Sequence, residues 1–329
     1  MESRSSHTLP EDGQQDPRHP DAGNERREPF RIEPFFSKPD THPFDELRWE
    51  RRDARIEDGT GELVFEQKDV EVPADWSMLA TNIVASKYFY GELGTGEREY
   101  SARQLVHRVA RTLADWGLAD NYLASPRDAE IFYHEITFLL INQYAAFNSP
   151  VWFNLGLHHV NGIEGSEGGY RYLLPARETE RVQQGYRNPQ CSACFIQSVE
   201  DNMEDIMRLA TAEAMLFKYG SGTGTDLSTI RSPKERLSGG GTPSGPPPFR
   251  GVYDQGAGFW KSGGKTRRAA KMQSIKCDHP DVLDFINAKR DEEEKAWALI
   301  EQGYDGSYNG EAYESVMFQN ANLSVRLDD

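Results

Sequence analysis

Strand-like and helix-like segments alternate in the C-terminal part of the chain, from Asn188 onwards. The segment CSACFIQSV is apolar and predicts a strand, and SGTGTDLSTIR predicts a second strand bounded by glycines. Between them, DNMEDIMRLATAEAMLFKYG has the apolar spacing of a helix, with Asp201 or Asn202 as its N-cap. We expect a helix near residues 252–262, a strand near 269–275, a helix over DHPDVLDFINAKR and a last strand over VMFQNANLSVRL. This order favours an α/β domain with largely parallel strands, in a sheet that the chain leaves incomplete.

The chain before residue 188 has a helical pattern instead. The segment SARQLVHRVARTLADWG repeats apolar residues at helical spacing, with Ser101 as the N-cap and Gly117 as the expected end of the helix. A second helix is predicted over PRDAEIFYHEITFLLINQYAAF, which has acidic residues in its first turn. We therefore expect four parts: a disordered arm over 1–29, an N-terminal cap segment with short strands over 30–75, a helical subdomain over 76–187, and the α/β part over 188–329.

Composition excludes several classes of function. The formal net charge is −16 over 329 residues, which argues against a nucleic-acid partner because an acidic surface repels phosphate backbones. No apolar run is long enough to span a membrane, and the polar, Pro-rich start lacks the apolar segment of a secretory signal. Three cysteines do not make a disulfide framework, so we expect a cytoplasmic protein in a reducing compartment.

Two of the three cysteines, Cys191 and Cys194, form a C-x-x-C pair. A redox pair of this spacing normally sits at the start of a helix, whereas here it leads into an apolar strand, where the two side chains point to opposite faces. A zinc site needs a second pair, which Cys277 alone does not supply, so no metal site is expected. Small buried cysteines are also common, and the pattern alone leaves these interpretations open. A C-x-x-C thiol oxidoreductase predicts a disulfide between Cys191 and Cys194.

Three further segments could bind phosphate. The glycine-rich turn KYGSGTGTDLSTIR offers successive backbone N–H groups, although it lacks the lysine of a P-loop and is also explained as a turn before a core strand. Ser149 precedes a proline in FNSPVWFNLG and is either a helix boundary or a ligand contact. The third segment is a basic cluster that is either a solvated surface or a phosphate site: Lys261, Lys265, Arg267, Arg268 and Lys271.

These segments stand in an order that resembles a known family. The run FNSPVWFNLG, SACF, GSGTGTDLSTIR, SGPPPF, GGKTRRAAKM, HPDVLDFI and NANLSV resembles the N-terminal half of the catalytic subunit of ribonucleotide reductases. The closest likeness is to the adenosylcobalamin-dependent (class II) type, over about residues 76–325. The resemblance implies a ten-stranded α/β barrel made of two half-barrels. This chain would supply an N-terminal helical subdomain followed by roughly half of that barrel.

The resemblance also implies roles for the substrate site. Cys194, in the S-A-C-F block, corresponds to one of two thiols that reduce the ribose 2′-position and become a disulfide. Its partner thiol belongs to the other half-barrel, so Cys191 is expected to be structural. Ser149, the Ala193–Cys194 backbone and Gly222 correspond to contacts with the phosphates and ribose of the ribonucleotide substrate.

The same resemblance implies an effector site and partners. Asp201 corresponds to an acid that binds the ribose of a dNTP or ATP effector, and Arg231 to a contact with its phosphates. Residues 289–320 correspond to a loop that relays effector identity. A homodimer through the effector-site helix, adenosylcobalamin as the cofactor and an external thioredoxin-like thiol reductant are implied as well.

The family's N-x-C-x-E block, which carries the thiyl-radical cysteine, has no counterpart in this sequence. We therefore expect the chain to need a C-terminal reductase half and to be inactive alone. Two alternatives remain open, the large subunit of a class I reductase and a non-catalytic dNTP-binding regulatory fragment.

Overall fold

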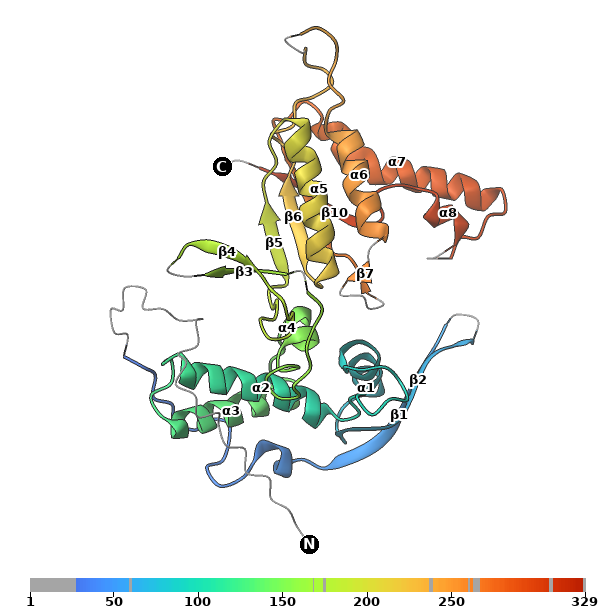
Figure 1. Cartoon of the computed structure of the whole chain (residues 1–329). Helices are drawn as coiled ribbons and strands as arrows, with labels where there is room; N and C mark the ends of the chain where they lie inside the picture. Colours follow the sequence, from blue (N-terminus) through green and yellow to red (C-terminus); the bar gives the residue numbers. More distant parts are fainter. Residues whose placement is uncertain are drawn as a thin grey trace.

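The structure is a computed structural model that describes residues 28–58, 61–167, 169–173, 176–236, 239–259, 261–262, 267–307 and 310–327. The disordered arm expected over 1–29 lies outside the described residues except for Glu28 and Pro29. The described residues form two lobes, with the N-terminal residues in one and a parallel sheet in the other (Figure 1). None of the described helices combines the length and apolar character that a bilayer crossing requires.

The N-terminal lobe contains an antiparallel hairpin of β1 (Trp49–Glu57) and β2 (Leu63–Pro73), preceded by the 3-10 turn η1 (Pro43–Glu46). The inward side chains of the hairpin pack in one core with residues of the following helices. The segment expected as an N-terminal cap therefore shares its hydrophobic core with the helical segment. The buried members of this core include Ala54, Val70, Val72, Trp76, Leu105 and Ile141.

Four helical elements complete this lobe: α1 (Met78–Ile83), the π-helix η2 (Val84–Tyr88), α2 (Ala102–Ala119) and α3 (Pro126–Ile141). The predicted N-cap of α2 is confirmed, because the side chains of Ser101 and Gln104 form a capping box. The predicted end at Gly117 is wrong, since α2 continues to Ala119. Glycine at 117 instead permits a close approach, because a Cβ there would lie 2.9 Å from Leu123 Cδ1.

A short helix and a second hairpin lie between the two lobes. Helix α4 (Ser149–Asn154) is followed by the antiparallel strands β3 (Tyr170–Leu173) and β4 (Glu178–Arg181). The range 76–187, expected to be helical, thus also contains a β-hairpin. Most side chains of β3 and β4 are exposed, so these strands have little of the apolar pattern that would predict them from sequence.

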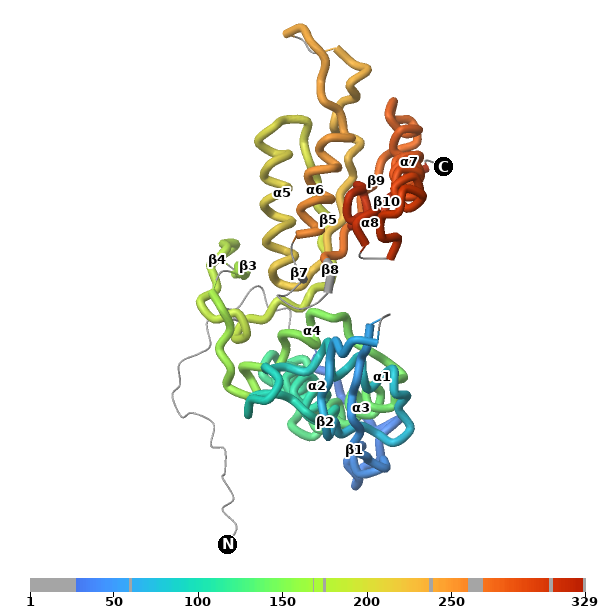
Figure 2. The backbone as a smooth tube through the Cα atoms, turned by 90° about the vertical axis from the view of Figure 1, so that its right-hand side faces the viewer, coloured from blue at the N-terminus to red at the C-terminus, as the bar shows by residue number. Residues whose placement is uncertain are grey.

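The second lobe is built on a four-stranded parallel sheet, in agreement with the predicted α/β fold. Its strands are β5 (Cys194–Gln197), β6 (Gly222–Asp226), β9 (Lys271–Lys276) and β10 (Ala321–Arg326), in the order β10-β9-β6-β5. Helices α5 (Met203–Lys218) and α6 (Pro246–Phe259) lie against one face (Figures 1 and 2). The remaining elements are β7 (Lys261–Ser262), β8 (Arg267–Arg268), α7 (Val282–Glu301) and α8 (Glu311–Glu314).

Helix α7 is longer than the sequence predicted. It continues through the charged segment DEEEKAWALIE to Glu301. Residues 289–320, expected to be a loop, are therefore helical up to Glu301 and again over the four residues of α8. Good helix formers such as Ala, Glu and Lys make this extension favourable.

Candidate functional site

Cys194 lies at the start of β5, where the chain enters the sheet. Its partner in the parallel register is Gly222, the first residue of β6. The Gly222 N–H donates a hydrogen bond to the Ala193 carbonyl oxygen at 2.6 Å. Three of the residues expected in the substrate site, Ala193, Cys194 and Gly222, are thus brought together at one end of the sheet.

The Cys194 thiol is exposed on the face of the sheet opposite to α5. Thr223 Oγ1 donates to Glu213 of α5, so residue 223 points toward that helix. Because side chains alternate along a strand, residue 222 and its register partner Cys194 point to the other face. Ile196, two residues after Cys194, is 80% exposed on this same face. A ligand can therefore reach the thiol without displacing a described helix.

Cys191 has a different environment. It packs beside Val109 of α2, Val151 of α4 and Leu155. Burial raises the pKa of the Cys191 thiol to about 11, which keeps it protonated and unreactive near neutral pH. Both Cys191 and Cys194 are free thiols. This environment favours the structural interpretation of Cys191 over a redox pair.

Ser149, the fourth expected substrate residue, is the first residue of α4. Its hydroxyl lies 3.2 Å from the Tyr88 hydroxyl. Asn154, the last residue of α4, donates through Nδ2 to the Gln190 carbonyl at 2.6 Å, which joins α4 to the segment before β5. Gln190 in turn hydrogen-bonds to Ser221. The sequence alone gives no sign of Asn154, Gln190 or Ser221, because isolated amide and hydroxyl side chains form no motif.

The two expected effector residues contact each other. Arg231 and Asp201 form an ion pair, although they are 30 positions apart in the chain. Both line a cavity of about 790 Å³ that has basic side chains from several elements. Its other charged lining residues are Asp226, Glu235, Arg236, Lys276, Asp278 and Arg326.

This cavity lies at the carboxyl ends of β6, β9 and β10, the position at which open α/β sheets bind ligands. Lys276 is the last residue of β9, and Arg326 is the last residue of β10. The predicted ends of these strands could therefore have identified both as candidate ligand-binding residues. Burial alone would raise the pKa of Asp226. Hydrogen bonds from Ser228, and from Arg326 at 2.7 Å, outweigh the effect of burial. They hold the pKa of Asp226 below its ordinary value. The cavity thus combines fixed carboxylates with several cations.

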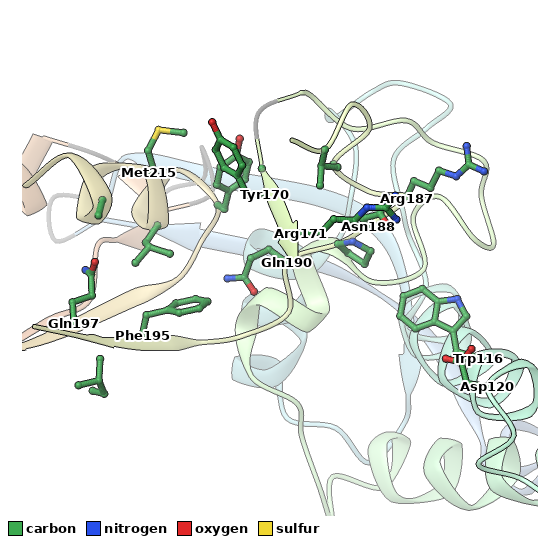
Figure 3. A pocket seen from close by; sticks show the side chains of 18 of the residues that line it. Trp116, Asp120, Tyr170, Arg171, Arg187, Asn188, Gln190, Phe195, Gln197 and Met215 are labelled. Atoms are coloured by element: carbon green, nitrogen blue, oxygen red, sulfur yellow. Dashed lines mark hydrogen bonds between the residues drawn. The ribbon is translucent and has the colours of Figure 1, made fainter. Parts of the chain in front are cut away.

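A second cavity, of about 1070 Å³, is larger than the Asp201–Arg231 cavity and lies beside β5 (Figure 3). Phe195 and Gln197, which alternate with Cys194, line it together with Met215 of α5. Tyr170 of β3 and Trp116 of α2 contribute aromatic surface from the neighbouring elements. Ile196, which lies on the same face of β5 as Cys194, also lines this cavity, whereas Cys194 itself does not.

The basic cluster falls largely outside what the structure describes. Lys265 is not described, and of Lys261, Arg267 and Arg268 only the backbone is. Lys271 is described, and its side chain is buried in an ion pair with Glu213. Both alternatives, a solvated surface and a phosphate site, are therefore wrong for Lys271. Within the described ranges, no group of three His, Cys, Asp or Glu side chains could hold a metal ion.

Comparisons with known proteins identify two matching family models. Residues 192–329 match "Ribonucleotide reductase, barrel domain", and residues 50–143 match "Class II vitamin B12-dependent ribonucleotide reductase". The vitamin B12-dependent ribonucleotide reductase of Rhodopirellula baltica is 62% identical over 288 residues, which cover 87% of this chain. The enzyme of the same name from Streptomyces coelicolor is 46% identical over 301 residues, which cover 91% of this chain.

The chain spans only 28% of the length of each of these two relatives. Among solved structures, the α subunit of a class Id ribonucleotide reductase from Actinobacillus ureae matches with a TM-score of 0.42 and 17% identity. That match covers 72% of this chain and 31% of the other.

Proposed function

We propose that this chain, which belongs to the family of class II vitamin B12-dependent ribonucleotide reductases, supplies three parts of ribonucleotide reduction. These are a binding site for the substrate phosphates, one reducing thiol and a dNTP specificity site. The observation that carries the proposal is the exposed Cys194 thiol beside the glycine backbone at Gly222.

Cys194 is the proposed reductant. In the proposed reaction the 2′-hydroxyl of the ribonucleotide leaves as water, while Cys194 and a second thiol give up two electrons and two protons and form a disulfide. Cys191 is a poor second thiol because burial raises its pKa to about 11. The proposal therefore takes the second thiol from a C-terminal reductase half, and an external thioredoxin-like dithiol reduces the disulfide again.

Backbone groups are the proposed contacts to the substrate. We propose that Ser149 with the α4 backbone, the Ala193–Cys194 peptide and Gly222 contact the phosphates and ribose of the substrate. The Gly222 N–H already donates to the Ala193 carbonyl, so the Ser149 hydroxyl and other backbone N–H groups are the proposed donors. Such donors bind anions without a cationic side chain, which suits a chain with a net charge of −16.

The cavity at Asp201 and Arg231 is the proposed effector site. A dNTP or ATP would place its ribose hydroxyl at Asp201 and its phosphates among Arg231 and the neighbouring cations. Arginine forms bidentate contacts with phosphate, and lysine acts as a point charge. Met203 and Met207 of the adjoining α5 are 60% and 49% exposed, one turn apart. This apolar stripe supports the proposed homodimer through the effector-site helix.

The cofactor of the proposed reaction is adenosylcobalamin, after the name that the relatives carry. When bound, it supplies the initiating radical. The proposal assigns no residue of this chain to the macrocycle, and it takes the radical-carrying cysteine from the C-terminal half.

Ribonucleotide reduction with adenosylcobalamin, dithiothreitol and dATP tests the proposal. The assay compares this chain alone, this chain with a polypeptide of the C-terminal half of a close relative, and the same mixture carrying Cys194→Ser. We expect activity only in the unmodified mixture. Cys191→Ser is the matched control and should retain activity. Equal activity of the Cys194→Ser and unmodified mixtures would refute the role of the thiol.

A second candidate function is a regulatory fragment that binds dNTPs without catalysis. It is favoured by the Asp201–Arg231 cavity, which combines carboxylates with several cations at the carboxyl ends of the strands. Nucleotide binding by the chain alone, together with an inactive mixture, would support this candidate instead.

A further inference from the structure

Glu213 and Lys271 form an ion pair in the interior of the second lobe. Glu213 lies on the sheet-facing side of α5 and Lys271 begins β9, with side chains 2% and 0% exposed. Thr223 Oγ1 of β6 donates to the same Glu213 oxygen at 3.1 Å. The Lys271 ammonium lies 4.7 Å from the ring centroid of Tyr253 in α6. The pair thus joins two helices and two strands.

A gain in stability is a weak explanation for a buried ion pair. Removing two charges from water costs about as much as their attraction returns, and apolar side chains of similar volume often replace such pairs without loss of stability. Burial lowers the pKa of Lys271, while the neighbouring Glu213 carboxylate acts in the opposite direction. A buried charge pair does, however, demand one geometry of its members, because a misplaced partner leaves a charge unpaired.

Glu213 is connected to the effector cavity through α5. Asn202 caps this helix by accepting the Asp205 N–H at 2.8 Å, and Asp201 lies directly before the cap. Glu213 follows about 15 Å along the axis from Met203, at a rise of 1.5 Å per residue. A displacement of α5 at its N-terminal end therefore reaches the Glu213 carboxylate.

Lys271 is connected to the reactive thiol through its neighbour Ala270. The Ala270 carbonyl accepts the Thr223 N–H at 2.9 Å. A Cβ at Gly222 would lie 2.8 Å from this carbonyl oxygen and 3.5 Å from Cys194 Sγ. A shift of β9 against β6 thus changes the packing around Cys194.

We propose that Glu213 and Lys271 are a positioning pair that couples nucleotide binding in the Asp201–Arg231 cavity to the geometry at Cys194. Neither residue touches the substrate; each acts through the element that carries it. The inference rests on the proposed function, because it needs a nucleotide in that cavity and a reactive thiol at position 194.

The test measures the alkylation of Cys194 in the 329-residue chain. Cys277→Ser removes the other exposed thiol, and iodoacetamide labelling of the Cys194 peptide is followed by mass spectrometry with and without saturating dATP. Equilibrium dialysis measures dATP binding separately. We expect dATP to change the labelling rate of Cys194 by about fivefold, at the low end of usual coupling between sites.

The decisive variant combines Glu213→Leu with Lys271→Met, which removes both charges at similar volume. We expect it to bind dATP with unchanged affinity while the effect of dATP on Cys194 labelling disappears. The control combines Lys38→Gln with Glu46→Gln, which removes an ion pair of the N-terminal lobe and should leave the effect intact. Thr223→Val removes the hydroxyl donor to Glu213 without changing the charge, and it should reduce the effect of dATP on Cys194 labelling. This variant provides the test if the double variant does not fold.

A double variant that folds, binds dATP and keeps the full effect overturns the positioning role, as does an unchanged effect in Thr223→Val. If dATP binds the parent chain but does not alter Cys194 labelling, the coupling is refuted while the effector site stands. If dATP does not bind at all, the proposed effector site fails, and the coupling fails with it.

Discussion

Cys194 and Gly222 face each other across β5 and β6 so closely that a Cβ at position 222 would lie 3.5 Å from the Cys194 sulfur. The same Cβ would lie 2.8 Å from the backbone oxygen of Ala270. The absence of a side chain at 222 therefore sets both the spacing of β6 and β9 and the free space beside the thiol.

Replacement of this glycine should be costly. Gly222→Ala forces the Ala270 backbone to move, and we expect a loss of about 1–3 kcal/mol in the free energy of unfolding. Gly224→Ala is the matched control, because its Cβ would meet only the flexible ends of Ile196 and Met272, at 3.0 and 3.4 Å. Its cost should stay below about 1 kcal/mol. Urea unfolding of the three proteins measures both values, and equal losses would contradict the backbone contact.

The two cysteines of the C-x-x-C pair should differ in reactivity. A pKa of about 11 for Cys191, against an ordinary value of 9.0, reduces its thiolate fraction about 100-fold at pH 8. We expect iodoacetamide to label Cys194 and Cys277 in the folded chain well before Cys191, and all three at similar rates in urea. Peptide mass spectrometry follows the three sites. Early labelling of Cys191, or a Cys191–Cys194 disulfide under mild oxidation, would favour the thiol oxidoreductase interpretation instead.

Removal of the cation at position 231 should weaken nucleotide binding. Arg231→Gln deletes a charged contact worth about 1.5–3 kcal/mol, so we expect the Kd for dATP to rise about 10- to 150-fold. Arg208→Gln is the control, since Arg208 pairs with Asp205 on the exposed side of α5. Equilibrium dialysis measures both affinities. Equal affinities of the two variants would exclude Arg231 from the effector site.

The N-terminal lobe should lose stability in mild acid. His42 and His107 both contact the Tyr133 hydroxyl, at 3.1 and 2.8 Å. Burial lowers the pKa of both imidazoles. His134 lowers the pKa of His42 further, and Arg111 lowers that of His107. The neighbouring carboxylates act in the opposite direction: Asp45, Asp115 and Glu130. The unfolded chain therefore binds protons first as the pH falls through the ordinary histidine value of 6.5.

The free energy of unfolding should consequently decrease between pH 7.5 and 5.5. Urea unfolding at several pH values, followed by tryptophan fluorescence, measures this change. His107→Gln should flatten the pH dependence, whereas His279→Gln should leave it in place, because His279 contacts the Ile230 carbonyl in the second lobe. A free energy of unfolding that does not change with pH in this window would contradict the assignment of the pH dependence to His42 and His107.

Most helices and strands of the second lobe could be predicted because their signals are local. The apolar period of α5 and the glycine-bounded strand β6 lie within single segments, and the structure confirms both. The differences arise where the local signal is weak or misleading. Gly117 lies within α2, which ends at Ala119, and the β3–β4 hairpin has little apolar alternation to detect.

The sequence by itself determined the order of strands and helices, the position of Cys194 at the start of a strand and, through its motifs, the family. Only the tertiary structure decided which distant residues meet. It pairs Asp201 with Arg231, and it takes Lys271 from an apparent surface cluster into the interior beside Glu213. The physical reason is that periodicity and capping depend on neighbours within a few residues. The partner of a charge depends on how separate elements pack and on the cost of leaving that charge buried and unpaired.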